Sequence, residues 1–160
     1  MTMLTADDVE TLADGAAASP HTLFAAIQQV AQRRLDAGLV TAMRHLAGEG
    51  IVERLYSSNH DAYPVGGRKV KRDSAWSRHV LAEHRVLVSA GDAALKEHYP
   101  DHGTIIGLGL HSCVNIPLVS DGACVGTLNL CAPRADWSAD EIAAARVLGL
   151  AALSAVLTIR

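Results

Sequence analysis

The central part of the chain reads Glu53-Arg54-Leu55-Tyr56-Ser57-Ser58-Asn59-His60-Asp61-Ala62-Tyr63-Pro64-Val65-Gly66-Gly67-Arg68-Lys69. Side chains of a strand alternate between two faces, so the beginning of this stretch predicts Arg54 and Tyr56 on a common face. The alternation stops after Ser58, where Pro64, a glycine pair and several basic residues indicate a long loop. Long loops of this kind are usually functional. The stretch therefore predicts a polar strand face with a loop that closes over it.

Two stretches further along predict a pair of strands, Ser112 to Val119 and Ala123 to Cys131, joined by the hairpin signal Asp121-Gly122. Their cores read Val114-Asn115-Ile116-Pro117-Leu118 and Val125-Gly126-Thr127-Leu128-Asn129-Leu130. One face is apolar and should pack under helices, whereas the other carries amides, a hydroxyl and thiols. A row of Arg54, Tyr56, Thr127, Asn129 and Asn115 is the composition expected of a small-ligand cleft. The alternative is that some of these groups lie at a sheet edge and face solvent.

The remaining elements follow from caps and periodicity. Ser19 and Pro20 begin a helix that runs to about Leu35, and Ser138 with Glu141 forms a capping box at the start of the last helix. Between them we expect a hairpin of Leu39 to Leu46 and Ile51 to Ser58, a helix from Ser74 through Glu83, a strand at Val86 to Val88 and a helix near Asp92 to His98. Residues 1–18 read as a flexible, loosely attached lead-in, and residues 19–160 as a single domain.

These stretches together resemble the GAF domain family over roughly residues 20–158, and in particular small stand-alone bacterial GAF proteins with the runs Arg54 to Ser58 and Tyr63 to Lys69. The resemblance implies an α+β, PAS-like fold with a central antiparallel sheet of five or six strands. The N- and C-terminal helices would cover one face, and a ligand pocket would lie beneath short helices and loops on the other. Members of the family bind cyclic nucleotides, tetrapyrroles, aromatic effectors or haem.

The composition fits one intracellular domain. The chain has 160 residues, of which 49% are hydrophobic and 19% charged, and a net charge of -3. The only basic cluster is Arg68 to Arg72, so we expect no nucleic-acid binding. Acidic residues occupy the N-terminus, where a secretory signal would be basic, which predicts a cytoplasmic protein. No membrane span is expected, although Ile142 to Ile159, interrupted by Arg146, comes closest. Cys113, Cys124 and Cys131 are expected to be free, buried thiols.

The expected function is small-molecule binding, for sensing or regulation. Aromatic residues are scarce, at 4%, yet several gather near basic residues of the central loop, which favours a planar or anionic organic metabolite. The expected pocket residues are Arg54, Tyr56, Tyr63, Lys69, Trp76, His102, Asn115 and Asn129. Arg54 or Lys69 would neutralise an anionic group, the aromatic rings would stack, and the asparagines would orient the ligand. Tyr63 and Trp76 could instead fill the core.

Two enzymatic alternatives remain open, and no cofactor can be named. The first is a GAF-fold enzyme with a histidine-rich pocket, possible metal ligands being His79, His84, His98, His102 and His111. Pro100 separates His98 from His102 and breaks the helix that would align them. The second is a thiol-based reductase of methionine sulfoxide, as in one branch of the family. Its reactive cysteine would lie in the region that here reads His98 to Gly109, which contains none.

The last predicted helix is apolar almost all round. It needs cover on more than one side, because such a helix leaves little polar surface for water. The sheet can cover one side, and we expect a second copy of the chain to cover another, in a homodimer formed through the terminal helices. The alternative is that the first helix provides all of the cover.

Overall fold

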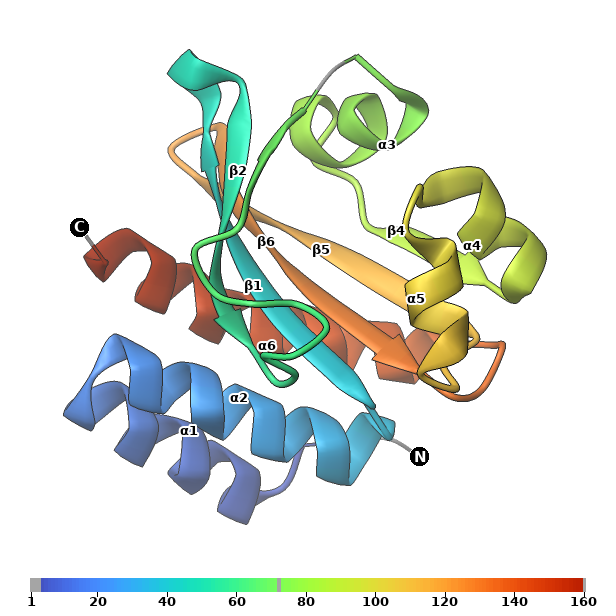
Figure 1. Cartoon of the computed structure of the whole chain (residues 1–160). Coiled ribbons are helices and arrows are strands. Elements are labelled where there is room, and N and C mark those ends of the chain that lie inside the picture. The colour runs from blue at the N-terminus through green and yellow to red at the C-terminus, as the bar shows by residue number, and fades with distance from the viewer. Residues whose placement is uncertain (1–3, 72, 160) are drawn as a thin grey trace.

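The computed structural model describes residues 4–71 and 73–159 as a sheet with three long helices on one face and short helices on the other (Figure 1). The strands are β1 (Leu39–Leu46), β2 (Ile51–Ser57), β3 (Arg68–Val70), β4 (Leu87–Ala90), β5 (Ser112–Ser120) and β6 (Ala123–Ala132). They form one antiparallel sheet in the order β3-β2-β1-β6-β5-β4. The predicted α+β fold and the number of strands are confirmed.

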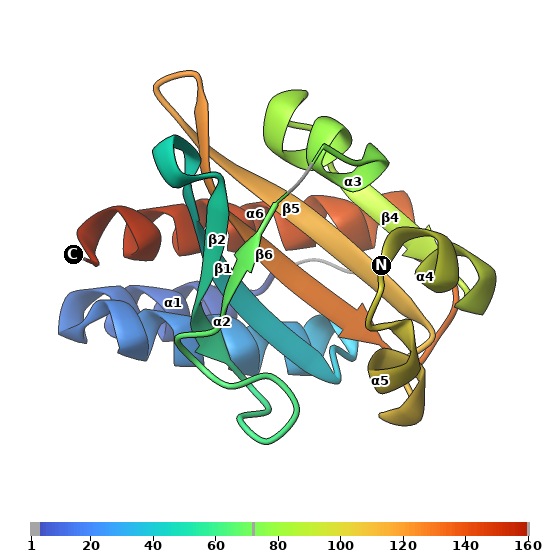
Figure 2. The same ribbon diagram turned by 45° about the horizontal axis from the view of Figure 1, so that its top comes forward.

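The strand pairing explains why the chain forms this sheet. The hairpins β1–β2 and β5–β6 were both predicted, and the one-turn helix Ala47–Glu49 connects the first pair. The central loop is not entirely irregular, because Arg68–Val70 pairs with β2 as the short strand β3, drawn in green beside β2 in Figure 2. The loop therefore returns along the strand that precedes it and holds that edge of the sheet.

A β-bulge in β2 changes which side chains share a face. Ala42 pairs with Tyr56 and Met43 pairs with Arg54, so Leu55 is an extra residue on β2. One extra residue reverses the alternation beyond it. Tyr56 accordingly lies on the helix side, where its ring stacks on Phe24 with 5.5 Å between centroids and its hydroxyl donates to Gln28. The prediction that Arg54 and Tyr56 share a face is wrong for this reason.

The helices α1 (Ala6–Ala18), α2 (Pro20–Leu35) and α6 (Ala139–Thr158) lie on one side of the sheet, with α2 and α6 against the strands and α1 packed on α2 (Figure 1). The caps predicted at Ser19 and Ser138 are present, the latter as a capping box. Ile27 and Val30 of α2 and Leu148 of α6 are buried against apolar residues of the central strands, and the main core lies in this layer. The helical face of β5 and β6 carries Val114, Ile116, Leu118, Leu128 and Leu130, as predicted.

Helix α1 occupies much of the segment for which we expected a flexible lead-in. Thr5 and Asp8 form a capping box, and the fully buried Asp8 carboxylate accepts hydrogen bonds from Arg33, at 2.6 Å, and Arg34, at 2.7 Å, of α2. These charge-assisted bonds join α1 to α2. The expectation of a loosely attached segment is thus wrong for residues 6–18.

Short elements cover the opposite face of the sheet. They are α3 (Ala75–Ser77), the π-helical turn η2 (Arg78–Ala82), α4 (Asp92–His98) and α5 (His102–Gly107), together with the loop between β2 and β3 (Figure 2). Ser74 caps α3 as predicted. Two small apolar clusters lie here, one around Leu95 and Ile105 and one around Trp76 and Val80. We call these elements the roof.

The cysteines differ from the prediction. Cys113 of β5 and Cys131 of β6 stand directly opposite each other and form a disulfide, whereas Cys124 is free and buried. The pairing of the strands brings the first two thiols together, which the spacing of cysteines in a sequence cannot reveal. The expectation of a free thiol is therefore wrong for Cys113 and Cys131.

Helix α6 is long and apolar enough to cross a membrane by length and composition. This differs from the sequence-based expectation, in which Arg146 interrupted the run. Much of α6 packs on the sheet, where Ala145, Leu148 and Ala152 have no exposed surface. A core helix satisfies the same test of length and composition.

Candidate functional site: a roofed cavity on the sheet

A cavity of about 580 Å³ lies between the sheet and the roof, and we call it the roofed cavity. Its volume falls within the range of small-molecule pockets. Strands β1, β2, β5 and β6 supply its floor, the loop, α3, α4 and α5 its walls, and Lys69, Lys71 and Lys96 several of its charged groups. The cavity is thus on the face opposite the long helices, where the resemblance placed a pocket.

Arg54 is the buried charge of this cavity. Its side chain is 8% exposed, its Nη1 donates to the Pro64 carbonyl at 3.0 Å, and its guanidinium carbon lies 5.1 Å from the Tyr63 ring centroid. Its Nε has no hydrogen-bond partner among the described residues. Burial lowers the pKa of Arg54, while the nearby Tyr63 and Asp101 oppose that shift. The cavity is therefore lined by a buried cation, one nitrogen of which has no hydrogen-bond partner among the described residues.

The loop between β2 and β3 holds Arg54 in position through backbone hydrogen bonds. The Arg54 N–H donates to the Gly67 carbonyl, and the Gly66 N–H donates to the Arg54 carbonyl, each at 2.9 Å. Gly66 has a φ of 85°, which favours glycine, and a Cβ on Gly67 would lie 3.0 Å from Arg54 Nη1. The Pro64 to Gly67 sequence thus turns the chain tightly and leaves room for the guanidinium.

A chain of hydrogen bonds joins the roof to three neighbouring strands. Asn115 Oδ1 accepts from Trp76 Nε1, at 3.1 Å, and from the Tyr99 hydroxyl. Asn115 Nδ2 donates to Asn129 Oδ1 at 2.7 Å, and Asn129 Nδ2 donates to Thr41 Oγ1 at 3.1 Å. We call this chain the amide network. The two asparagines that we expected to orient a ligand are thus also bonded within the protein, where Asn115 contacts Trp76 and Tyr99.

Two tyrosines of the cavity remain protonated under ordinary conditions. Burial raises the pKa of Tyr99 to about 12. Burial and the hydrogen bond to Asp101 raise the pKa of Tyr63 as well, with the Tyr63 hydroxyl donating to Asp101 Oδ2 at 2.7 Å. Both hydroxyls are therefore donors whose partners are already present, and neither is available as a base.

Lys71 adds a second partly buried cation. Its Nζ lies 4.2 Å from the Trp76 ring centroid, a cation–π contact. Burial, followed by the charge of Lys69, lowers the pKa of Lys71, and Asp101 acts in the opposite direction. An anion placed between Lys71 and Arg54 would relieve the unfavourable desolvation of both cations.

The cavity contains six of the eight predicted pocket residues: Arg54, Tyr63, Lys69, Trp76, Asn115 and Asn129. Tyr56 is excluded because the bulge turns it to the helix side. His102 does not line the cavity, and its Nδ1 lies 2.8 Å from the Tyr99 carbonyl oxygen. Sequence reasoning missed Lys71, Lys96, Tyr99 and Asp101. The available signals were the position of Lys71 in the basic cluster and the turn Tyr99-Pro100-Asp101.

Four of the five histidines proposed as metal ligands have other partners. His79 Nε2 lies 2.9 Å from the Val86 carbonyl oxygen, His98 Nδ1 lies 2.7 Å from Ser89 Oγ, and His111 Nδ1 lies 2.6 Å from Asp92 Oδ1. His84 lies at a different surface groove. Within residues 4–71 and 73–159, no group of three or more histidine, cysteine, aspartate or glutamate side chains is arranged to hold a metal ion.

The cysteines do not favour the reductase alternative. A nucleophilic cysteine must be an accessible thiolate. Burial raises the pKa of the Cys124 thiol, which favours the unreactive protonated form, and the other two sulfurs are bonded to each other. No observation therefore selects thiol-based reduction as the function of this cavity.

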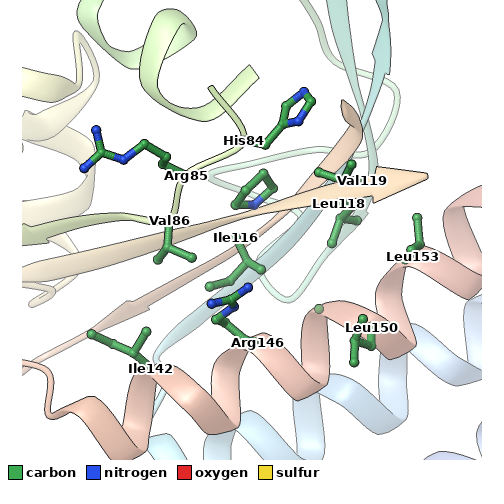
Figure 3. Close-up of a pocket in the computed structure, with 12 residues that line it drawn as sticks. His84, Arg85, Val86, Ile116, Leu118, Val119, Ile142, Arg146, Leu150 and Leu153 are labelled. Atoms are coloured by element: carbon green, nitrogen blue, oxygen red, sulfur yellow. The ribbon is translucent and has the colours of Figure 1, made fainter. Parts of the chain in front are cut away.

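A second hollow, of about 480 Å³, lies between α6 and the β4–β5 side of the sheet, and we call it the α6 groove. Figure 3 shows Ile142, Arg146, Leu150 and Leu153 of α6 opposite Val86, Ile116 and Leu118. His84 and Arg85 lie at its upper side in that view. The groove lacks the aromatic walls and the amides of the roofed cavity, so we take the roofed cavity as the candidate site.

The structure combines an antiparallel sheet, terminal helices on one face and a roofed cavity on the other. The family model of the GAF domain matches residues 19–156. The chain belongs to the GAF domain family, whose members are ligand-binding sensory modules. Comparison with curated proteins gives no match.

Solved structures of GAF domains share the fold. One is from a phosphoenolpyruvate-protein phosphotransferase of Coxiella burnetii, with a TM-score of 0.74 and 16% identity over 94% of this chain and 90% of that one. The corresponding Acinetobacter domain has a TM-score of 0.71 and 12% identity, with coverages of 96% and 95%. A domain of a Bacillus halodurans sensor histidine kinase has a TM-score of 0.60 and 18% identity, with coverages of 95% and 93%. These similarities concern the fold alone.

Proposed function

We propose that this GAF domain senses a small organic anion with a planar group, which binds in the roofed cavity. The observation that carries the proposal is Arg54, a buried guanidinium whose Nε has no hydrogen-bond partner among the described residues. Such a group is costly to bury unless an anion or hydrogen-bond acceptor completes its environment. A ligand carboxylate can do both, because guanidinium and carboxylate groups match in geometry.

The surroundings of Arg54 support a planar ligand. Trp76, Tyr63 and Tyr99 provide aromatic surface, and the amide network fixes two of these rings. Aromatic rings stack well on flat groups, and rigid walls lower the entropy that is lost on binding. Lys71 lies over Trp76 and adds positive potential to the same space. We therefore place the planar part of the ligand beside the rings and its anionic group near Arg54.

The proposal is tested by calorimetric titration with 1-naphthoate, a planar anion, and with 1-naphthalenemethanol, its neutral counterpart. Naphthoate is expected to bind more tightly. The Arg54→Gln variant should weaken naphthoate binding about tenfold or more, because a charge-assisted hydrogen bond contributes about 1.5–3 kcal/mol. The same variant should bind the neutral compound as the original protein does.

Arg68→Gln is the matched control, because Arg68 is an exposed arginine at the other end of the same loop. It should leave naphthoate binding unchanged. Equal affinity for the two compounds would contradict the anionic part of the proposal. In an NMR titration with a panel of planar carboxylates, protein resonances that shift only outside the roofed cavity would contradict the proposed site.

We also propose a homodimer formed through the terminal helices. Val147, Leu150 and Leu157 of α6 are large apolar residues that are exposed in the single chain. Val9 of α1 is exposed as well. Exposed apolar side chains concentrated on one element support a protein interface. A second copy of the chain would bury them, and a sensor that forms such a dimer could transmit ligand binding through α6.

A further inference from the structure

Two sulfur atoms lie in the floor of the roofed cavity. Cys113 and Cys131 are register partners on β5 and β6, with Cα atoms 4.0 Å apart, and both line the cavity. Cys124, the third cysteine, is buried but does not line it. Cys113 is 1% and Cys131 5% exposed, so the disulfide is buried directly beneath a space that a small molecule can enter.

The sheet does not depend on this bond for its topology. Strands β5 and β6 are already joined by the tight turn at Asp121 and Gly122, and their ladder extends from the pair Ser112–Ala132 to the pair Ser120–Ala123. Opening the disulfide leaves those backbone hydrogen bonds in place. The reduced chain can consequently keep the same fold, which a reversible site requires.

Several apolar residues clustered with the disulfide belong to the roof or to the segment that follows it. Leu95 of α4, Ile105 of α5 and Leu110 form one buried cluster with Cys113 and Cys131. Bonded sulfurs lie about 2.05 Å apart, whereas sulfurs that merely touch must lie at least about 3.5 Å apart. In a close-packed layer the neighbouring side chains must move to accept this separation. The oxidation state of the pair is therefore coupled to the packing of α4 and α5.

We infer that Cys113 and Cys131 form a reversible thiol–disulfide site, opened by a small dithiol that enters the roofed cavity, and that opening it loosens α4 and α5. A thiolate of the dithiol attacks one sulfur and breaks the protein S–S bond, which gives a mixed disulfide. The second thiol of the reagent then displaces the protein sulfur. In sum, two electrons and two protons pass to the cysteine pair and the dithiol becomes a cyclic disulfide.

Thiol counting tests the exchange. The oxidised protein, denatured and titrated, should show one free thiol, from Cys124, and the protein treated with dithiothreitol without denaturant should show three. Oxidised glutathione should restore the single thiol. A bond that resists dithiothreitol until the protein unfolds would overturn the inference, as would three thiols that oxidised glutathione does not pair.

Hydrogen exchange tests the coupling. After native reduction, amides in residues 95–110 should exchange about threefold faster or more, because their buried packing is loosened, while residues 23–35 of α2 should not change. Cys124→Ala should behave as the original protein, and Cys113→Ala/Cys131→Ala should show no effect of dithiothreitol. Reduction without any change in residues 95–110 would overturn the coupling. The measurements use no ligand, so failure of the anion-binding proposal would leave this inference standing.

Discussion

Asn115 shows how a single side chain holds the site together. It is buried and satisfies three neighbours at once: the indole of Trp76, the hydroxyl of Tyr99 and the amide of Asn129. A buried polar group that loses its partner costs about 1–3 kcal/mol. The rings around the cavity are thus positioned by polar contacts as well as by apolar packing.

The Asn115→Ala variant should lose about 3 kcal/mol of the free energy of unfolding, because it leaves the Trp76 N–H and the Tyr99 O–H without their acceptor. Urea denaturation measures this loss. Asn129→Ala should cost less, and the double variant should cost less than the sum, because the two residues share a hydrogen bond. Strict additivity would show that the amide network does not act as a unit.

Asp8 should make the free energy of unfolding depend on pH in the acidic range. Burial alone would raise the pKa of this carboxyl, but bonds from Thr5, Arg34 and Arg33 lower it below its ordinary value. A lowered pKa in the folded state stabilises above the unfolded pKa, near 4, and that stabilisation is lost as the pH falls toward the folded pKa. Urea midpoints measured between about pH 5 and pH 2.5 should therefore fall more steeply for the original protein than for Asp8→Asn.

Asp14→Asn is the control for that measurement, since Asp14 is an exposed aspartate on the same helix. It should retain the steep fall. At neutral pH, Asp8→Asn should lose about 2 kcal/mol, the magnitude of hydrogen bonds to a charged group. Parallel pH profiles for Asp8→Asn and the original protein would rule out a stabilising role for the carboxylate.

Single side chains also show where sequence reasoning ends. Arg54, Tyr63, Lys69 and Trp76 could be assigned to one cavity because basic and aromatic residues gather in one loop and strand. Tyr56 was assigned to the same cavity wrongly, because the sequence gives no sign of the bulge at Leu55, which reverses the alternation of side chains. The partners of Asn115 lie in elements far apart in the chain, so its role depends on tertiary contacts that a local pattern does not contain.

At the level of elements, α6 and β5 approach each other unusually closely at one residue. A Cβ placed on Gly149 would lie 2.7 Å from Cγ2 of Ile116, closer than side-chain atoms can approach. Glycine inside a helix normally costs about 1 kcal/mol relative to alanine. Replacing Gly149 by alanine would normally recover this free energy, but here the close packing of helix and strand opposes the replacement. Packing therefore explains the glycine at this position.

Gly149→Ala should therefore fail to stabilise the protein and should lower the free energy of unfolding by about 1 kcal/mol, because overpacking costs more than helix propensity returns. Thermal or urea unfolding measures the change. In an Ile116→Ala background the clashing methyl group is absent, so the same substitution should become neutral or stabilising. Equal costs in both backgrounds would place the cause elsewhere.

The first helix illustrates how elements differ in what their sequences disclose. The capping pair Thr5 and Asp8 was a readable signal for the start of α1. The helix has few large apolar residues, however, and the ion pairs of Asp8 with Arg33 and Arg34 contribute to its attachment to α2. Periodicity detects apolar stripes, so it recovered α2, and a capping box marked the start of α6, whereas α1 was missed.

For the whole molecule, the proposed dimer would explain why one face of α6 is apolar and exposed in the single chain. Leu150 is 69% exposed in the single chain and borders the α6 groove. The buried side of the same helix is occupied by the sheet and α2. A second copy that covers Leu150 and its neighbours would complete the apolar surroundings of a helix that has few polar residues.

Leu150→Glu should convert the proposed dimer to a monomer, because it would place a carboxylate from each copy in an apolar interface. Size-exclusion chromatography with light scattering measures the mass. Val70→Glu is a matched control, because Val70 is also 69% exposed but lies on β3, far from α6 in the sheet order. A monomeric original protein at micromolar concentration, or a dimeric Leu150→Glu variant, would contradict the proposal.

The amide network also has an evolutionary consequence. Its members come from α3, the turn after α4 and strands β5, β6 and β1, and each donor has an acceptor in another element. Replacing one member alone leaves its neighbour without a hydrogen-bond partner. Substitutions should therefore appear together in lineages, rather than one at a time, at five positions: Thr41, Trp76, Tyr99, Asn115 and Asn129. The five positions should therefore be inherited as a set, and relatives that exchange the set should also have exchanged their ligand.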